Sequence, residues 1–432
     1  MLTKKYKSPS HKEINDLFNY YKDKRYDEAE KLAISLSKKF PENQFAWKIL
    51  GEIFRIKNRL PDSLRALEIS VKINSQDHEA YNNLGVTLQK LGKLESAEMS
   101  FKKAIELKSS YAEAYNNLGV TLQELGKLES AEMSFKKAIE LKSNFSDAHH
   151  NLGKVLYLYK NYKKAAENFS LSDYAKSETY LLKCQFLKND EHSFTKQLDY
   201  LIEKNEINAV IGSFIHRSKI KYGIIRKNPY CNYPLKYIYK TNLTKRYDFE
   251  NTFIKPAKKI LNTTDISFKD QNLLINGFQT SGDLFRQDID FKDEIKKIIF
   301  SEVENYRTHF KDSEEGLIKN WPVSYDISAW LINLKSGGKL KPHMHDSGWV
   351  SGSIYINVPP KLKPDSGNLV VCLDYEESDP NIILPSHTQN EKKIIDVVTG
   401  TLCLFPSSLL HYTIPFESNE ERIVLAFDIK SK

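Results

Sequence analysis

The feature that most constrains how this chain can fold is an internal repeat in its N-terminal half. Residues 77–110 and 111–144 differ at only four of 34 positions. A fixed period of about 34 residues is typical of a solenoid in which each repeat is one pair of helices. Such a pair cannot bury its apolar face alone, so neighbouring repeats stack and share a continuous core. The sequence therefore predicts an all-α N-terminal solenoid.

Small and apolar residues recur at the same places in both repeats. They are Tyr81, Leu84, Gly85, Ala97, Phe101 and Ala104, followed 34 residues later by Tyr115, Leu118, Gly119, Ala131, Phe135 and Ala138. With this spacing the segment resembles the tetratricopeptide repeat family, and weaker matches on both sides extend the resemblance over residues 10–175. The resemblance implies a curved array with a concave groove. We expect residues 176–236 to form a helical cap and linker.

One asparagine position is shared by three successive repeats, at Asn83, Asn117 and Asn151. In several tetratricopeptide proteins an asparagine at this position contacts the backbone of an extended peptide. A side-chain amide suits that task because it can both donate and accept a hydrogen bond. The resemblance thus implies a groove that binds a protein or peptide. The alternative is that these asparagines are ordinary solvated helix residues.

Composition narrows the classes of function. The chain has 432 residues, enough for two or three domains, and its net charge of +8 comes from lysines mixed with acidic residues. That mixture favours a solvated surface over a nucleic-acid-binding track. No apolar stretch is long enough to span a membrane, and the N-terminus lacks the apolar run of a signal peptide. We therefore expect a cytoplasmic protein that binds neither nucleic acid nor membranes.

The four cysteines agree with that compartment. Cys184, Cys231, Cys372 and Cys403 are far apart, and none forms a C-x-x-C pair. This usage indicates reduced, buried thiols rather than disulfides.

From about residue 322 onward, short β-branched and aromatic runs alternate with turn residues. The runs are 328–334, 350–356, 368–373, 393–398, 401–405, 411–414 and 422–427. Seven or eight such strands suit a jelly roll, and a helix is expected before them at 288–306. We expect this domain to cover residues 237–432. The predicted fold class is multidomain, with the all-α solenoid followed by a mainly-β double-stranded β-helix, or jelly roll.

Three histidines in the β-rich part have the spacing of a metal site. His343 and His345 are two residues apart, so both point to the same side of a strand. His411, on a later strand, can complete a three-point face around a divalent metal. Such a face with open positions suits a non-haem Fe(II) centre. Asp346 is an alternative second ligand if a bulge turns it inward, although strand geometry favours His345.

Further motifs follow one another in a recognisable order. They are Asn276–Thr280, Leu284-Phe285, Trp330, Asn333, His343-x-His345, Ser351-Gly352, Tyr355, Gly367, Phe405-Pro406, His411 and Arg422. In this order they resemble a bacterial and phage family of 2-oxoglutarate- and Fe(II)-dependent oxygenases, which has distant prolyl-hydroxylase kinship and a double-stranded β-helix fold. The resemblance covers roughly residues 240–432. His345 departs from the H-x-D or H-x-E of the wider superfamily.

The resemblance implies roles for individual residues. The implied metal ligands are His343, His345 and His411. Arg422 would bind the distal carboxylate of 2-oxoglutarate, since a guanidinium pairs with a carboxylate through two hydrogen bonds. Tyr355 and Asn333 would help to bind this co-substrate.

These roles imply a dioxygenase that uses Fe(II) and 2-oxoglutarate to hydroxylate a protein or peptide recruited by the repeats. Two alternatives stay open. One is a protein-interaction scaffold with a catalytically inactive jelly roll. The other is a cupin-like metal enzyme that does not use 2-oxoglutarate.

Overall fold

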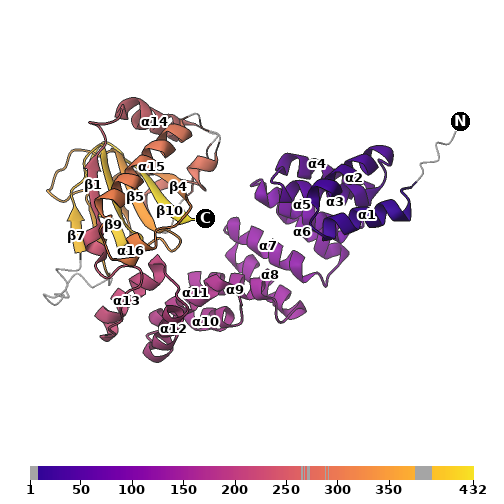
Figure 1. Cartoon of the computed structure of the whole chain (residues 1–432), viewed down its shortest axis with the longest axis horizontal. Coiled ribbons are helices and arrows are strands. Elements are labelled where there is room, and N and C mark those ends of the chain that lie inside the picture. Colours follow the sequence, from indigo (N-terminus) through magenta and orange to yellow (C-terminus); the bar gives the residue numbers. More distant parts are fainter. Residues whose placement is uncertain are drawn as a thin grey trace. The chain divides into compact units, whose positions relative to one another are not determined.

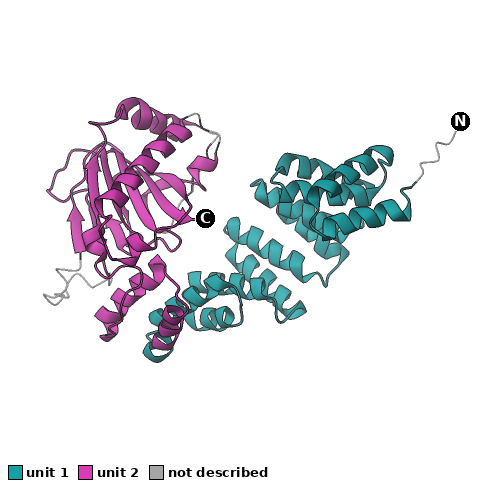
Figure 2. Ribbon diagram, viewed as in Figure 1, with its two compact units in different colours: residues 1–194 teal, residues 195–432 magenta. Residues whose placement is uncertain are grey.

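The computed structural model describes residues 8–263, 266, 268–269, 273–287, 289, 291–374 and 392–432. The chain divides into two compact units, residues 1–194 and 195–432 (Figure 2). The first unit is helical, and the second combines helices with two β-sheets. None of the helices in the described ranges has both the length and the apolar composition needed to cross a bilayer.

The first unit is a succession of paired helices (Figure 1). Its elements are α1 (His11–Lys22), α2 (Tyr26–Lys39), α3 (Gln44–Ile56), α4 (Leu60–Ile73), α5 (His78–Lys90), α6 (Leu94–Leu107), α7 (Ala112–Glu124), α8 (Leu128–Leu141), α9 (Ser146–Leu158), α10 (Tyr162–Ser170) and α11 (Ala175–Leu187). The unit ends within α12 (Glu191–Glu203). The predicted helical solenoid is therefore confirmed.

The recurring glycine explains how the two helices of a repeat approach each other. A Cβ atom on Gly85 would lie 2.6 Å from the ring of Phe101, and one on Gly119 would lie 2.6 Å from the ring of Phe135. Both phenylalanines are completely buried. Because no side chain larger than hydrogen fits, each glycine lets an aromatic ring fill the space between paired helices.

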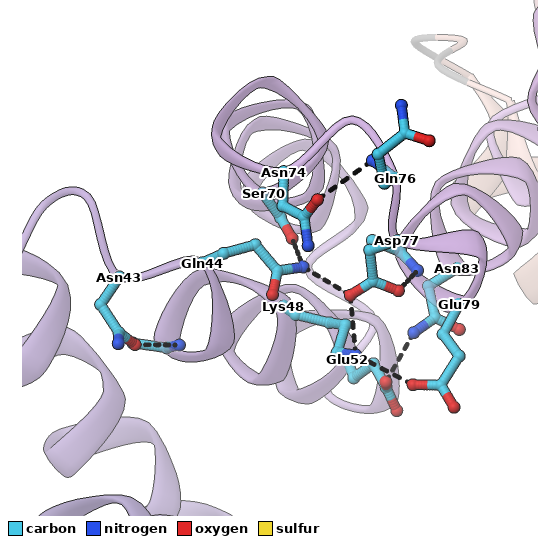
Figure 3. A network of polar contacts seen from close by, with 12 residues as sticks. Asn43, Gln44, Lys48, Glu52, Ser70, Asn74, Gln76, Asp77, Glu79 and Asn83 are labelled. Carbon is cyan, nitrogen blue, oxygen red and sulfur yellow. Dashed lines mark hydrogen bonds and ion pairs between the residues drawn. The ribbon is translucent and has the colours of Figure 1, made fainter.

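Polar contacts join α3, α4 and α5 at the N-terminal side of the near-identical repeats (Figure 3). Asp77 caps α5 by accepting a hydrogen bond from a backbone N–H of its first turn. The amide of Gln44 donates to both Ser70 and Asp77. The ammonium nitrogen of Lys48 lies 2.9 Å from a carboxylate oxygen of Asp77 and 2.9 Å from one of Glu79. The Lys48–Asp77 pair is largely buried, so water screens it little.

We expect Asp77→Asn to lower the free energy of unfolding of the repeat array by about 1 kcal/mol at neutral pH. Asparagine can still cap α5, but it no longer pairs with the Lys48 ammonium. Burial acts to raise the pKa of Asp77, yet hydrogen bonds from Lys48 and the helix backbone outweigh it and lower the pKa below its ordinary value of 3.8. Urea unfolding of both proteins at pH 7 measures the difference.

The lowered pKa fixes how this difference depends on pH. The contribution of Asp77 is fully present above its ordinary pKa and is lost as the pH falls through the lowered, folded-state pKa. The two urea midpoints should therefore converge in strong acid. Glu79→Gln is the matched control, because Glu79 contacts the same lysine from a side chain that is 57% exposed. Equal midpoints for wild type and Asp77→Asn at pH 7 would contradict the prediction.

The second unit begins within α12 and contains the remaining elements. Its helices are α13 (Ala209–Tyr222), η1 (Pro234–Tyr237), η2 (Glu250–Ile254), α14 (Lys255–Asn262), η3 (Leu284–Arg286), α15 (Lys292–His309) and α16 (Gly316–Lys319). Its strands are β1 (Tyr239–Asn242), β2 (Phe268–Lys269), β3 (Leu274–Thr280), β4 (Tyr325–Leu340), β5 (Val350–Asn357), β6 (Leu369–Cys372), β7 (Lys392–Ile395), β8 (Thr401–Pro406), β9 (Leu410–Thr413) and β10 (Arg422–Ser431).

The strands form two antiparallel sheets. The larger has the order β1-β8-β5-β10-β4-β3-β2 and the smaller has the order β7-β6-β9. Tyr355 and Val424 of the larger sheet share a core with Leu369 and Val371 of the smaller one, so the sheets face each other. An antiparallel β-sheet domain after the helical solenoid is therefore confirmed. Strands β1, β2 and β3 lie before residue 322, where the predicted strand pattern begins. They were not predicted, because they are too short or too interrupted to show alternation.

The two faces of the larger sheet have different tasks. In β4, Ile327, Ala329 and Leu331 share a core with α14 and α15, which lie against that face (Figure 1). The alternate residues Trp330 and Ile332 line a cavity on the face toward the smaller sheet. Successive side chains of a strand point to opposite faces, so one strand serves both a packed core and a cavity wall.

All four cysteines are free and buried, as their spacing predicts.

Candidate metal centre

The three histidines predicted as ligands come together on the cavity side of the second unit. His343 and His411 face each other as an isolated antiparallel bridge, with backbone N–H···O distances of 3.2 and 2.8 Å. Their ring centres are 4.2 Å apart, and the ring of His345 lies 5.1 Å from that of His343 and 4.8 Å from that of His411. One nitrogen from each ring lies within 4.8 Å of the others. This cluster could hold a metal ion.

Hydrogen bonds orient the three rings for that task. The Nδ1 atom of His343 lies 2.9 Å from the carbonyl oxygen of Lys341, and Nδ1 of His345 lies 2.5 Å from a carboxylate oxygen of Asp428. A longer contact of 3.5 Å joins Nδ1 of His411 to a backbone carbonyl. Because these oxygens accept hydrogen bonds, the contacts of His343 and His345 favour the tautomer with the proton on Nδ1. Their Nε2 atoms lie 3.2 Å apart, close enough to bind one ion together. A second nitrogen fixed in this way is typical of metal-binding histidines.

Two of the rings are held in their neutral form by burial. Desolvation, with the charge of His345 nearby, lowers the pKa of His343 to about 4. Desolvation also lowers the pKa of His411 well below its ordinary range, and the other two histidines act in the same direction. Neutral imidazole is the form that binds a metal. At physiological pH the cluster therefore needs to lose no proton from these two rings before it can coordinate.

Asp428 is a candidate site residue that the motifs did not reveal. Its carboxylate is 4% exposed and also accepts a hydrogen bond of 2.8 Å from the hydroxyl of Ser351, which itself contacts Ser407 at 2.8 Å. Burial acts to raise the pKa of Asp428, but His345 and the Ser351 hydrogen bond outweigh it and lower the pKa. Asp428 thus places a negative charge directly behind His345.

The alternative second ligand, Asp346, does not join the cluster. Among the described residues, the group of side chains spaced to hold a metal consists of the three histidines. Asp346 instead lies at the exposed rim of the cavity. The structure thus brings His345, and not Asp346, together with His343 and His411.

A pair of variants separates the two aspartates. We expect Asp428→Asn to weaken metal binding about 10- to 100-fold, because asparagine keeps the shape but removes the charge behind His345. Asp346→Asn should leave the affinity within about twofold. Dissociation constants for Mn(II) or Co(II), measured by calorimetry with each variant, test this. The reverse pattern, with loss only in Asp346→Asn, would make Asp346 the ligand.

The histidines open into a cavity of about 380 Å³. Its walls include Trp330 and Ile332 from β4, Tyr355 from β5, Arg422 and Val424 from β10, and Phe405 from β8. Most of these side chains are apolar, so the few polar groups would determine which ligand binds and how it is oriented. Such a cavity can enclose a small co-substrate and exclude water around it.

Arg422 is the strongest sign of an anionic ligand in this cavity. It is 2% exposed, and its guanidinium carbon lies 5.0 Å from the ring centre of Tyr355. Its Nε and Nη2 atoms have no hydrogen-bond partner within the described structure. Burial lowers the pKa of Arg422, but a guanidinium remains charged in a protein interior. A buried cation with unused donors suits a carboxylate, so these residues fit 2-oxoglutarate.

The structure places the other predicted site residues as follows. Tyr355 lies in the cavity wall beside Arg422. Asn333 pairs with Ile423 on the opposite, helix-packed face of the sheet, and its amide donates to Glu421 at 2.7 Å. Among the described residues that line the cavity Asn333 is not included, so the structure does not bring it into the predicted co-substrate pocket. Strand alternation is the reason, because Ile332 and Leu334 take the cavity side.

The three repeat asparagines lie in the first unit and bridge successive repeats. The amide nitrogen of Asn83 donates to Glu52 at 2.6 Å, as Figure 3 shows, and that of Asn117 donates to Asn82 at 3.0 Å. Asn151 makes the equivalent bond to Asn116 at 3.1 Å. Their N–H donors thus hold neighbouring repeats together. The groups left to contact a bound peptide are the amide oxygens.

Comparisons with known families agree with this architecture. Residues 76–144 and 19–78 match two tetratricopeptide repeat models. Residues 328–428 match the model of a family described as "Putative 2OG-Fe(II) oxygenase". The matched range contains the three histidines, Arg422 and Asp428. The predicted combination of tetratricopeptide repeats with this kind of domain is therefore confirmed.

Several solved structures resemble part of this chain at low sequence identity. PilF of Pseudomonas aeruginosa is 17% identical, with a TM-score of 0.43 over 47% of this chain and 94% of its own. YrrB, a TPR protein with an unusual peptide-binding site, is 20% identical, with a TM-score of 0.36 over 42% and 93%. A tetratricopeptide repeat protein from Parabacteroides merdae is 16% identical, with a TM-score of 0.40 over 49% and 85%. No curated protein matches the chain in sequence.

Proposed function

We propose that residues 237–432 form a 2-oxoglutarate- and Fe(II)-dependent dioxygenase. Its substrate would be a protein or peptide bound by the repeats of residues 10–175, with residues 176–236 as a helical cap and linker. One observation carries the proposal. A three-histidine cluster and a buried guanidinium with unused donors line the same cavity. The first suits the metal and the second suits the carboxylate of the co-substrate.

When bound, Fe(II) and 2-oxoglutarate would supply oxidative decarboxylation of the co-substrate and transfer of one oxygen atom to a C–H bond. The residues of the chain have the supporting tasks. His343, His345 and His411 would hold the metal through Nε2. Arg422 would bind the distal carboxylate, with the ring of Tyr355 packed against its guanidinium. The apolar walls would exclude water, which strengthens these charge interactions.

The repeats support a protein or peptide as the substrate. Tetratricopeptide arrays present an extended surface on which a partner can lie. Asn83, Asn117 and Asn151 occur at a regular spacing and use their N–H groups within the array. Their carbonyl oxygens would be the groups that accept hydrogen bonds from the backbone of a bound peptide.

The three-histidine cluster also favours a second candidate, a cupin-like metal enzyme that does not use 2-oxoglutarate. Three imidazoles without a carboxylate ligand suit such an enzyme. However, that reaction assigns no task to the buried Arg422, whose desolvation is costly without a partner. The oxygenase accounts for both observations, and for this reason we prefer it.

Succinate formation tests the proposal directly. The protein would be purified without oxygen, loaded with Fe(II) and 2-oxoglutarate, and then exposed to oxygen. We expect succinate to appear even without substrate, at a slow rate. Stoichiometric iron with no 2-oxoglutarate binding would favour the cupin-like enzyme. A protein that binds neither iron nor 2-oxoglutarate would favour a scaffold with an inactive domain.

A further inference from the structure

The run Asn276–Thr280 in β3 is a motif to which the proposed reaction assigns no task. Four of its five residues have structural roles. Asn276 adopts a left-handed backbone conformation, with φ of 50°. A Cβ atom on Gly277 would lie 2.6 Å from a backbone oxygen of β4. Phe278 packs its ring against another aromatic ring, and Thr280 accepts a backbone N–H of β4 at 3.1 Å. Gln279 remains unexplained.

Gln279 faces the cavity, and its amide has no partner there. It lies opposite Ile332, so both side chains point to the cavity side of the sheet. Gln279 is 6% exposed, yet no described residue forms a hydrogen bond with its side-chain amide. Its amide atoms are open to the cavity rather than sealed within the protein, so a molecule in the cavity can reach them. An unpaired amide in a cavity wall therefore points to a ligand that satisfies it.

The position of Gln279 separates it from the co-substrate. Arg422 and Val424 belong to β10, whereas Gln279 belongs to β3, and β4 lies between them. Neighbouring strands are about 5 Å apart, so Gln279 lies about 10 Å to one side of β10. On the same side, the ring of Trp330 lies 5.3 Å from that of the metal-ligand candidate His345. Gln279 of β3 and Trp330 of β4 thus line the wall of the cavity on the β3 side of the strand that carries Arg422.

We propose that Gln279 binds an amide group of the substrate, and that this substrate is a peptide. This inference rests on the proposed oxygenase function and names the substrate class of the same site. A carboxamide side chain and a peptide amide are complementary, because each can donate an N–H to the oxygen of the other. An anion, which only accepts hydrogen bonds, would leave the Gln279 oxygen without a donor. Trp330 offers the adjacent flat, apolar surface for the peptide's side chain.

The rim of the cavity is consistent with an uncharged group. Among the described lining residues, the acidic Asp346 and the basic Lys430 are the charged ones other than Arg422 and Asp428. Their charges oppose each other, so the entrance does not select strongly for an anion or a cation. Selection by the paired hydrogen bonds of Gln279 would then decide which group enters next to the metal.

A peptide pool and ester substitution test the inference. A tryptic digest of proteins from the source cells is incubated with the full chain, Fe(II), 2-oxoglutarate and oxygen, and peptides that gain one oxygen atom are identified by mass spectrometry. One such peptide is then synthesised with each amide in turn replaced by an ester. Binding is measured by calorimetry with Mn(II) in place of iron, so that no turnover occurs.

We expect Gln279→Leu to weaken peptide binding about tenfold, the effect of losing paired hydrogen bonds of about 1.4 kcal/mol in total. Affinities for Mn(II) and 2-oxoglutarate should not change. One ester replacement should weaken binding to the wild type by a similar factor and have no further effect in Gln279→Leu. This coupling is the signature of a direct contact.

Three results would overturn the inference. The first is equal peptide affinity in Gln279→Leu and wild type. The second is an ester effect that is the same in both proteins at every position. The third is succinate formation by a wild-type protein that neither binds nor hydroxylates any peptide of the pool. In that third case the oxygenase would stand and only the peptide substrate would fall, whereas absence of 2-oxoglutarate binding would overturn the proposed function itself.

Discussion

Replacing His411 by alanine is expected to abolish metal binding and, with it, all succinate formation. His411 supplies one of the three ring nitrogens of the cluster and is 5% exposed, so solvent cannot readily take its place as a ligand. Loss of a residue behind a ligand typically costs 10- to 100-fold in affinity, and loss of the ligand itself should exceed about 100-fold. The measurement is the dissociation constant for Mn(II), together with succinate produced from Fe(II)-loaded protein.

The backbone pairing of His411 makes this variant interpretable. The bridge to His343 uses only backbone N–H and carbonyl groups, which alanine retains. The fold should therefore persist, as circular dichroism and thermal unfolding can verify. His192→Ala is the matched control, because His192 is an exposed histidine of α12. Tight metal binding by His411→Ala would show that the three-histidine cluster is not the metal site.

Replacing Arg422 by methionine is expected to weaken 2-oxoglutarate binding by more than about 100-fold. Each hydrogen bond to a charged group contributes about 1.5–3 kcal/mol, and a guanidinium can make two of them to one carboxylate. Metal affinity should stay within about twofold, because Arg422 is not among the residues that could hold the ion. Calorimetric titration with 2-oxoglutarate in the presence of Mn(II) measures the loss.

The stability of the Arg422 variant provides a second, independent readout. Removal of an unpaired buried charge in favour of an apolar side chain of similar length is often neutral or stabilising. The melting temperature should therefore not fall. Arg286→Met is the matched control, since the side chain of Arg286 is 81% exposed. Unchanged 2-oxoglutarate binding in Arg422→Met would contradict the assigned role, and metal-dependent activity that persists without 2-oxoglutarate would favour the cupin-like enzyme.

Some parts of the fold could be predicted because their periods are visible in the sequence. The 34-residue repeat fixes helix pairs, since glycine and phenylalanine recur where paired helices meet. Strands β1, β2 and β3 were not predicted, because short or interrupted segments do not display alternation. The metal centre followed from His343 and His345 on one face of the chain. Their pairing with His411 was a prediction that the motif alone could not establish, because the register of a strand depends on the whole sheet.

The remaining site residues needed the three-dimensional register. Asn333 was expected in the co-substrate pocket, yet the pairing of β4 with β10 directs it to the helix-packed face. Asp428 was missed, although a signal existed. Counting in steps of two from Arg422 along β10 leads through Val424 and Ala426 to Asp428 on the same face. Gln279 was part of a motif, but nothing in the motif shows which of its residues faces the cavity.

The alternation along β10 has a consequence for how faithfully this site forms. Arg422 and Asp428 share one face of the strand, while Ile423, Leu425 and Phe427 are buried on the other. A shift of the strand by one residue would drive both charges into the apolar core and expose three large apolar side chains to the cavity. Such a misfolded form would be heavily penalised. The same hydrophobic packing that stabilises the domain thus also fixes the strand register that places Arg422 and Asp428 in the cavity.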